Sequence, residues 1–277
     1  MTIPVVLISK TLRQSLQLEF VIKQAETKNK EVFLIGDEGN KQFCPNNHRY
    51  ISEYDEGVVE FEGLYQHLST NPEDIERFCF SRWFVLRNFL RTNKYEGAFY
   101  IDDDILLFAD ATAEFENYKH LYCTLSGKSS GHSSYWSLEG LEAFCEYLME
   151  VYSDKNSYEF ERLSSHYYTR QKFGLNGGLC DMTLLESFGR YKYPHLVGEV
   201  SIASLFELYY DHVIHESAGF EHKNGLKWVT FKNGVPYCSH LKLGVHIPFA
   251  TIHFQGNHKN LIEIYYKDCN DSLISHK

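Results

Sequence analysis

Three consecutive aspartates, Asp102 to Asp104, lie between two apolar runs and constrain the fold of this chain more than any other stretch. The runs Phe99 to Ile101 and Ile105 to Phe108 are rich in residues that favour a buried strand. Three adjacent charges cannot be buried unpaired without a large desolvation cost, so a positive group must lie beside them. Ligands of open α/β sheets collect beyond the carboxyl ends of the strands, where Asp102 and Asp104 can bind one hard cation. An acidic turn or a solvated helix cap is the alternative.

Composition indicates a globular protein with a real core. The chain has 277 residues, of which 43% are hydrophobic, and a formal charge of −10, which argues against a nucleic-acid backbone or an anionic membrane surface as the main partner. The seven cysteines form no CxxC pair and are typical of reduced thiols in a cytoplasmic protein. We expect no signal peptide, no transmembrane segment, and membrane contact only through the acceptor.

The first sixty residues predict a β-α-β unit, which implies parallel strands. The first strand ends near Ile8, and the following helix has Thr11 as its N-cap and Leu12 and Leu16 on its apolar face. We expect one domain over residues 1–277, with a nucleotide-binding half over about 1–110 and an acceptor half over about 111–277.

A long helix is predicted after Pro72, with an apolar stripe from Ile75 to Leu90. It carries Arg82, Arg87 and Arg91, and it leads into the strand before the aspartates, so one of these arginines could face the same site. Surface charge pairing is the alternative for each of them. Further on, Ser126 to Ser134 contains Gly-Lys-Ser without the first glycine of a P-loop, which favours a mobile loop beside the site.

Two later stretches predict close approach to a ligand and a hairpin. Paired glycines in Asn176 to Gly178 let the backbone approach a ligand, although these residues alone slightly favour an ordinary tight turn. An apolar helical segment is expected to end near Leu208. Asn233-Gly234 is the favoured two-residue turn of a β-hairpin, so the last third of the chain should be more antiparallel than the first.

The stretch His253 to Lys259 ends an apolar strand. Its histidine can offer a neutral imidazole to a metal, and Gly256 lets the chain turn so that Lys259 returns to the same point. A lone histidine is more often structural, but here it accompanies an aspartate cluster and a lysine.

Four stretches, in this order, resemble the GT-A glycosyltransferases, and within them the retaining family that includes the bacterial lipopolysaccharide galactosyltransferases and glycogenin. Ser81 to Arg87 is similar to the helix ahead of the metal motif, with Arg87 at the family's arginine, and Tyr100 to Asp104 is similar to its Asp-x-Asp strand end. Asn176 to Gly178 is similar to the Asn-small-Gly segment at the sugar site, and His253 to Lys259 to the C-terminal His-x-x-Gly-x-x-Lys.

The resemblance implies an α/β GT-A fold, a mixed and mostly parallel sheet flanked by helices, with a short antiparallel hairpin near the C-terminus. It implies a hexosyltransferase that moves a sugar from a nucleoside-diphosphate sugar, expected to be a UDP-sugar, to a glycan, a lipid-linked saccharide or another hydroxyl acceptor, with retention. Mn²⁺ or Mg²⁺ would be held by Asp102, Asp104 and His253. The donor would be bound by Ile8, Arg87, Asp102, Asp103, Gly256 and Lys259.

The residues expected at the reaction centre are Asn176, Asp181 and Glu199. If the enzyme retains configuration, the leaving phosphate can take the acceptor's proton, whereas inversion would need Asp181 or Glu199 as general base. The chain departs from the family where Asn260-Leu261 follows the lysine in place of Pro-Trp, and Val197 to Val200 is only a loose counterpart of its Asp-Gln-Asp segment.

Two other classes of function stay open. A metal-dependent nucleotidyltransferase or phosphohydrolase also uses clustered aspartates, but it commonly recruits a second metal through further carboxylates. A relative that binds a sugar nucleotide without catalysis is the other alternative.

Overall fold

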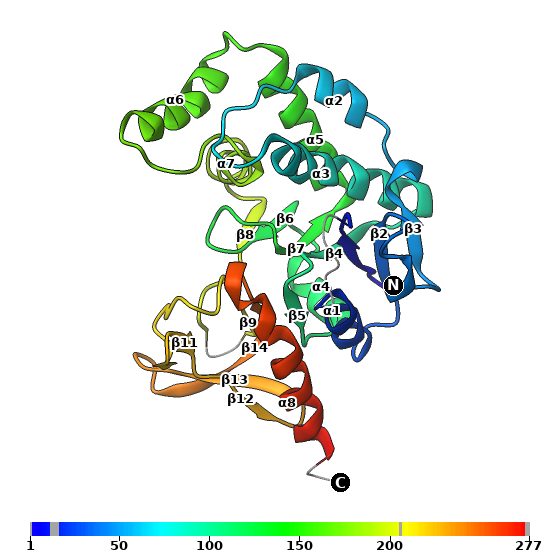
Figure 1. Ribbon diagram of the computed structural model, residues 1–277, viewed down its shortest axis with the longest axis vertical. Helices are drawn as coiled ribbons and strands as arrows, with labels where there is room; N and C mark the ends of the chain where they lie inside the picture. Colours follow the sequence, from blue (N-terminus) through cyan, green and yellow to red (C-terminus); the bar gives the residue numbers. More distant parts are fainter. Residues whose placement is uncertain (1, 12–16, 205–206, 275–277) are drawn as a thin grey trace.

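The computed structural model describes residues 2–11, 17–204 and 207–274. A seven-stranded sheet with the order β3-β2-β1-β4-β7-β6-β8 forms the centre of the molecule (Figure 1). Its strands are β1 (Val5–Ile8), β2 (Val32–Gly36), β3 (His48–Tyr50), β4 (Gly97–Ile101), β6 (Cys123–Leu125), β7 (Ser133–Ser137) and β8 (Val197–Glu199).

Most strand pairs of this sheet are parallel. Strand β1 lies between β2 and β4 and is parallel to both. Strand β3 is parallel to β2, and β8 is parallel to β6, whereas β7 is antiparallel to both β4 and β6. The carboxyl ends of β1, β2, β4, β6 and β8 therefore meet at one edge of the sheet. The mixed, mostly parallel sheet and the opening β-α-β unit are confirmed.

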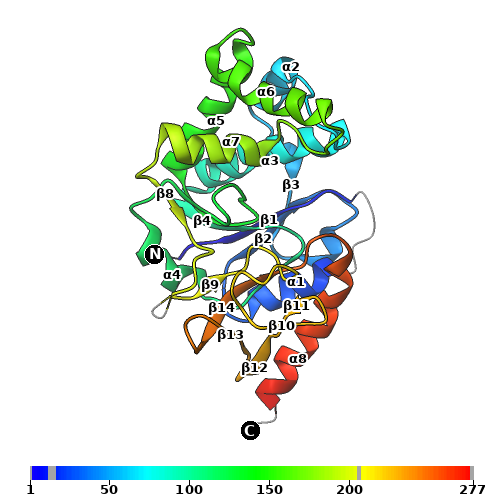
Figure 2. The same ribbon diagram turned by 90° about the vertical axis from the view of Figure 1, so that its left-hand side faces the viewer.

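Helices cover both faces, so the strands are apolar on both sides rather than alternating. Figures 1 and 2 show α2, α3, α5, α6 and α7 on one side of the sheet, and α1, α4 and α8 on the other. The bounds are α1 (Gln17–Glu26), α2 (Val58–Leu64), α3 (Glu73–Asn93), α4 (Ala111–Tyr118), α5 (Leu138–Ser153), α6 (Tyr158–Lys172), α7 (Asp181–Ser187) and α8 (Ile262–Ile274), with short helical turns η1 (Lys41–Phe43), η2 (Ile51–Glu53), η3 (Phe188–Lys192) and η4 (Gly256–Leu261).

A second sheet packs below the first in Figure 1. Its antiparallel strands are β12 (Thr230–Lys232), β13 (Val235–His240), β14 (Val245–His253) and β5 (Ile105–Leu107), and β9 (Tyr209–Tyr210) is parallel to β14. Strands β10 (His222–Lys223) and β11 (Leu226–Lys227) form a separate two-stranded sheet. Asn233 and Gly234 both have positive φ, as a primed hairpin turn requires, so the predicted hairpin is confirmed.

Strand β5 connects the two sheets. It follows the aspartates directly and pairs with β14 so that Ile105 lies opposite His253. This long-range pairing brings the end of β14 to the end of β4.

Two local predictions have different outcomes. Leu12 and Leu16, on the predicted apolar face of the first helix, lie outside the described residues, and the helix is described from Gln17. The helical segment expected to end near Leu208 is wrong for residues 201–204 and 207–208, which are not helical.

Candidate active site

The aspartates lie where β4 ends at the carboxyl edge of the main sheet. All five residues of β4 are buried, so the chain emerges from the core only at Asp102. The Asp102 backbone N–H donates to the carbonyl of His132, and the Ile105 N–H donates to the carbonyl of Asp102, which closes a tight turn into β5. The turn places three carboxylates side by side at this edge.

A nearly buried arginine of α3 holds the first carboxylate. Arg82 Nη1 lies 2.7 Å from Asp102 Oδ1, and its Nη2 lies 2.7 Å from Oδ2 of Asp181, at the N-terminus of α7. The Tyr100 hydroxyl also donates to Asp102, and Trp83 Nε1 donates to Asp181 over 3.2 Å. Arg82 thus ties the turn after β4 to the segment that follows the paired glycines.

A more exposed lysine holds the other two carboxylates. Lys259 Nζ lies 3.1 Å from both Asp103 Oδ1 and Asp104 Oδ2, and 41% of the lysine side chain is exposed. The Ser9 hydroxyl donates to the other Asp103 oxygen over 3.2 Å. Gly256, with φ of +63°, begins η4, the turn that returns Lys259 to the aspartates as predicted.

His253 faces the third carboxylate. Its Nδ1 contacts the carbonyl of His212, and because a carbonyl only accepts, this nitrogen must carry the proton. In the neutral ring the other nitrogen, Nε2, then carries no proton and has a free lone pair. Nε2 lies 3.4 Å from Asp104 Oδ1. That oxygen is buried and has no hydrogen-bond partner in the described part of the chain. Two lone pairs face each other, so a proton or a cation must lie between them.

The pKa values follow from these contacts. Burial opposes the charged form of Asp104, but a protonated His253, which can donate from Nε2 to this carboxyl, and then Lys259 outweigh burial and lower the pKa of Asp104. Burial likewise opposes protonation of His253, yet Asp104 raises the pKa of the ring above its ordinary value. The pKa of Lys259 is raised, because Asp103 and Asp104 outweigh its partial burial.

These residues fit a divalent cation in part. The unpartnered Asp104 oxygen and the Nε2 lone pair of His253 are ligands that Mn²⁺ or Mg²⁺ accepts. Asp102, expected as the third ligand, instead bonds Arg82 and Tyr100 through Oδ1. Accordingly, no group of three or more His, Cys, Asp or Glu side chains suited to a metal is found among the described residues.

The prediction for Arg87 is not supported by its position. Arg87 Nη2 donates to the carbonyl of Glu56 and its Nε to Asn88, away from the aspartates. Arg87 lies five positions after Arg82 in the helix, so the two side chains project from the helix about 140° apart. The arginine that faces the site is Arg82.

The remaining predicted residues lie at different distances from the aspartates. Ile8 ends β1 inside the core, and its neighbour Ser9 supplies the polar contact. Asn176 is exposed, in a segment that bonds Thr70 through Gly177 and pairs Leu179 with Leu68. Asp181 joins the site through Arg82.

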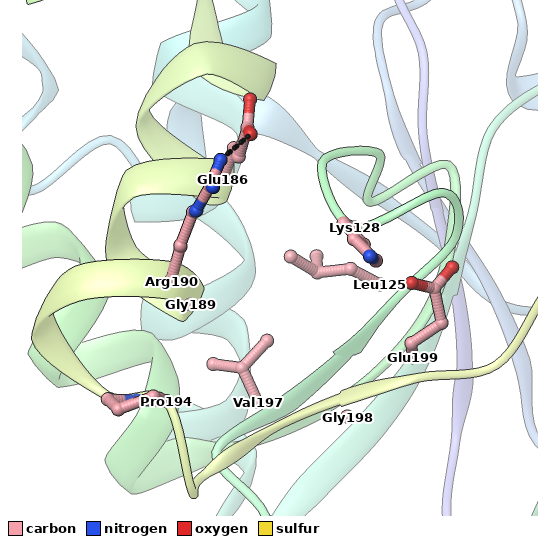
Figure 3. Close-up of a pocket in the computed structure, with 9 residues that line it drawn as sticks. All are labelled: Leu125, Lys128, Glu186, Gly189, Arg190, Pro194, Val197, Gly198 and Glu199. Atoms are coloured by element: carbon pink, nitrogen blue, oxygen red, sulfur yellow. Dashed lines mark hydrogen bonds and ion pairs between the residues drawn. The ribbon is translucent and has the colours of Figure 1, made fainter.

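Glu199 ends β8 at the same sheet edge, three strands from β4, or about 14 Å at the usual strand spacing. It lies in a pocket of about 430 Å³. Figure 3 shows Lys128 and Glu199 on one side of this pocket, Glu186 and Arg190 on the helical side, and apolar side chains such as Leu125 and Val197 between them. A pocket with charged walls and apolar side chains between them can hold a polar substrate at the same sheet edge as the aspartates.

Most of the stretch from Ser126 to Ser134 is buried, and its mobility stays a prediction. Only residues 127–129 reach the surface, because Ser126 and Ser130 exchange two backbone hydrogen bonds and the residues after Ser130 are buried. Residues 126–132 therefore form a short connection from β6 to β7, which begins at Ser133.

Sequence reasoning missed Ser9, Tyr100 and His132. The His132 ring is buried 4.1 Å from the ring of His253, measured between centroids, and neither of its nitrogens has a hydrogen-bond partner in the described ranges. Burial, then His253, lowers its pKa well below the ordinary value. The available signal was position: Ser9 directly follows a strand, and His132 directly precedes one.

Comparisons with known proteins give structural likenesses only. No protein-family model matches the chain, and no curated protein matches it in sequence. One similar structure is a glycosyltransferase involved in the glycosylation of the major capsid of PBCV-1, with 8% identity, a TM-score of 0.45, and coverage of 95% of this chain and 98% of the other. Another is an active-site mutant of LgtC, with 11% identity, a TM-score of 0.49, and coverage of 97% of this chain and 96% of the other. At this level of likeness, the function must be inferred from the side chains themselves.

Proposed function

We propose that this protein is a metal-dependent glycosyltransferase that moves a sugar from a nucleoside-diphosphate sugar to a hydroxyl acceptor. The observation that carries the proposal is the pair Asp104 Oδ1 and His253 Nε2, two potential metal-ligand atoms 3.4 Å apart beside a lysine at the carboxyl edge of an α/β sheet. This edge is where such sheets bind nucleotides. The inference that the bound nucleotide carries a sugar rests on the motif resemblance.

Each side chain then has a role. Asp104 and His253 would hold Mn²⁺ or Mg²⁺, and oxygens of the substrate diphosphate and water would complete the coordination, as is usual when few protein ligands are present. When bound, the cation would stabilise the charge that develops on the departing nucleoside diphosphate. Lys259 would add a second positive charge beside the phosphates, and Arg82 keeps Asp102 in place.

The acceptor is proposed to bind in the pocket that contains Glu199. Asp181, the other carboxylate considered as a base, accepts from both Arg82 and Trp83 and is buried. Glu199 accepts a hydrogen bond from Ser201 over 2.7 Å and faces the pocket, so it is the better placed of the two to act as a base. A UDP donor and retention of configuration rest on the motif resemblance alone.

Thermal-shift measurements on the whole chain test the proposal. A ligand that binds only the native state raises the melting temperature. UDP and UDP-sugars should therefore raise the melting temperature when Mn²⁺ is present, and raise it much less when Mn²⁺ is absent. Release of UDP with transfer of the sugar to an added saccharide would establish the reaction. If UDP-sugars and Mn²⁺ leave the melting temperature unchanged, the proposal is wrong. Phosphate release from nucleotides without sugar transfer would favour a phosphohydrolase.

A further inference from the structure

The turn after α6 exposes large apolar side chains on a rigid backbone. Phe173 is 69% exposed and Leu175 is 51% exposed, and Tyr168 on the last turns of α6 is also exposed. Between the two apolar residues, Gly174 has φ of +65°. The Leu175 N–H donates to the carbonyl of Arg170 and the Gly174 N–H to that of Gln171, a hydrogen-bonded helix end.

This exposure is not explained by the fold. In a helix end of this type the apolar residue after the glycine usually packs back on the helix, whereas Leu175 is 51% exposed. Arg170 Nε also donates to the carbonyl of Asn176, which fixes the turn further. Large apolar side chains exposed close together in sequence, on a turn held by hydrogen bonds, favour a contact site.

The charge around this turn is opposite to that of the whole chain. Residues 162–180 contain Arg162, Arg170 and Lys172 and no Asp or Glu, whereas the chain carries a formal charge of −10. Arg162 is paired with Glu159 at 2.7 Å, and the exposed Glu161 directly precedes this stretch, so the positive charge at the turn comes from Arg170 and Lys172. Because exposed charges are screened beyond about 8 Å at physiological salt, the acidic remainder of the molecule does not cancel this local charge.

The position of α6 suits contact with a large flat surface. Figures 1 and 2 show α6 at the end of the molecule farthest from the C-terminus. Within the described residues no helix is long and apolar enough to span a bilayer. Aromatic and aliphatic side chains beside Arg and Lys are the combination that binds at the headgroup level of a membrane.

We propose that the end of α6 and its turn, residues 166–175, form a docking surface for an anionic lipid bilayer, with Phe173 and Leu175 inserted at the headgroup level and Lys172 facing the lipid phosphates. This inference is independent of the reaction. It identifies a partner surface rather than a substrate.

Vesicle co-sedimentation of the full chain tests it, with phosphatidylcholine vesicles and with vesicles that also contain phosphatidylglycerol. We expect binding to the anionic vesicles that weakens at high salt. The double variant Phe173→Ser, Leu175→Ser should bind about tenfold or more weakly, because two apolar side chains no longer enter the headgroup region. Lys172→Glu should weaken binding to anionic vesicles alone.

The β13–β14 turn offers a matched control. Leu241 and Leu243 flank Lys242 and are 70% and 43% exposed, so Leu241→Ser, Leu243→Ser removes similar apolar area elsewhere. This control should bind vesicles as the wild type does, and all variants should keep the wild-type melting temperature. Hydrogen exchange over residues 166–175 should slow with anionic vesicles.

Three results would overturn the inference. The first is equal vesicle binding by the wild type and the Phe173, Leu175 variant. The second is that the wild type does not bind vesicles. The third is self-association of the wild type that the variant abolishes, which would assign the turn to contact between two copies.

Discussion

The two ends of the aspartate row are held by cations of different kinds. At one end Arg82 lies nearly buried between Asp102 and Asp181 and contacts both through 2.7 Å ion pairs. At the other end Lys259, 41% exposed on a flexible stem, reaches Asp103 and Asp104 across 3.1 Å. The buried guanidinium fixes one carboxylate in place, whereas the exposed ammonium can be displaced or can turn to a phosphate. The site thus combines a structural end and an exchangeable end.

The largest expected effect is at the structural end. Arg82→Met leaves Asp102 and Asp181 without their shared cation, and loss of one partner from a buried ion pair costs about 3–5 kcal/mol of unfolding free energy. Urea unfolding measures this. Arg91→Met is the matched control on the same helix, since its pair with Glu142 is exposed and should contribute about 0–1 kcal/mol. An equal loss of unfolding free energy in both variants would mean that the ion pairs of Arg82 contribute no more to stability than an exposed pair.

At the exchangeable end, the ligand pair should govern metal binding. Asp104→Asn and His253→Ala each remove one of two facing ligands, so Mn²⁺ affinity should fall by about 100-fold or more, because loss of a supporting partner alone costs 10–100-fold. Calorimetry with MnCl₂ measures it. His246→Ala, an exposed histidine on the same strand β14, is the control and should bind as the wild type does. Wild-type affinity in all three variants would contradict the metal assignment.

Lys259 should matter for phosphate and little for stability. Lys259→Ala should weaken binding of UDP with Mn²⁺ by about 1–3 kcal/mol if the ammonium makes a charge-assisted contact. Its unfolding free energy should change much less than that of Arg82→Met, because the side chain is half exposed. The control is Lys267→Ala, an exposed lysine paired with Glu263 on α8. Unchanged UDP affinity would leave Lys259 as a counter-ion of the aspartates only.

The sequence predicts the parts of this site better than their pairing. The buried run before Asp102, the strand that ends at His253 and the turn at Gly256 follow from local patterns, and the structure has each of them. The pairing of β5 with β14 joins segments almost 150 residues apart, and no local pattern specifies that register.

The expectation for Arg87 rests on the motif resemblance, whereas the residues of the helix left Arg82, Arg87 and Arg91 as candidates, and the structure has Arg82 at the site. Periodicity assigns charged residues to the solvent side of a helix, but Arg82 lies on the buried side because two carboxylates meet it there. Likewise, the serines and glycines between Ser126 and Ser134 predict a loop, which residues 126–132 form, but they do not predict the tertiary contacts that bury most of that stretch. The single-domain organisation over residues 1–277 stays a prediction.

The smallest expected effect is a pH dependence that distinguishes the two ends. The pKa of His253 is raised in the folded state, so its ion pair with Asp104 stabilises the metal-free protein below the ordinary histidine pKa of about 6.5, and this contribution is lost as pH rises through the raised value. Mn²⁺ requires the neutral ring, so its affinity should rise over the same window, by at most about tenfold per pH unit.

Calorimetry with MnCl₂ across that window, together with urea unfolding of the metal-free protein, measures the two opposite slopes. His253→Ala should flatten both, whereas Arg82 should contribute to neither, because a guanidinium stays protonated throughout. A steep rise of Mn²⁺ affinity that persists in His253→Ala would assign the proton to another group and remove His253 from the exchangeable end.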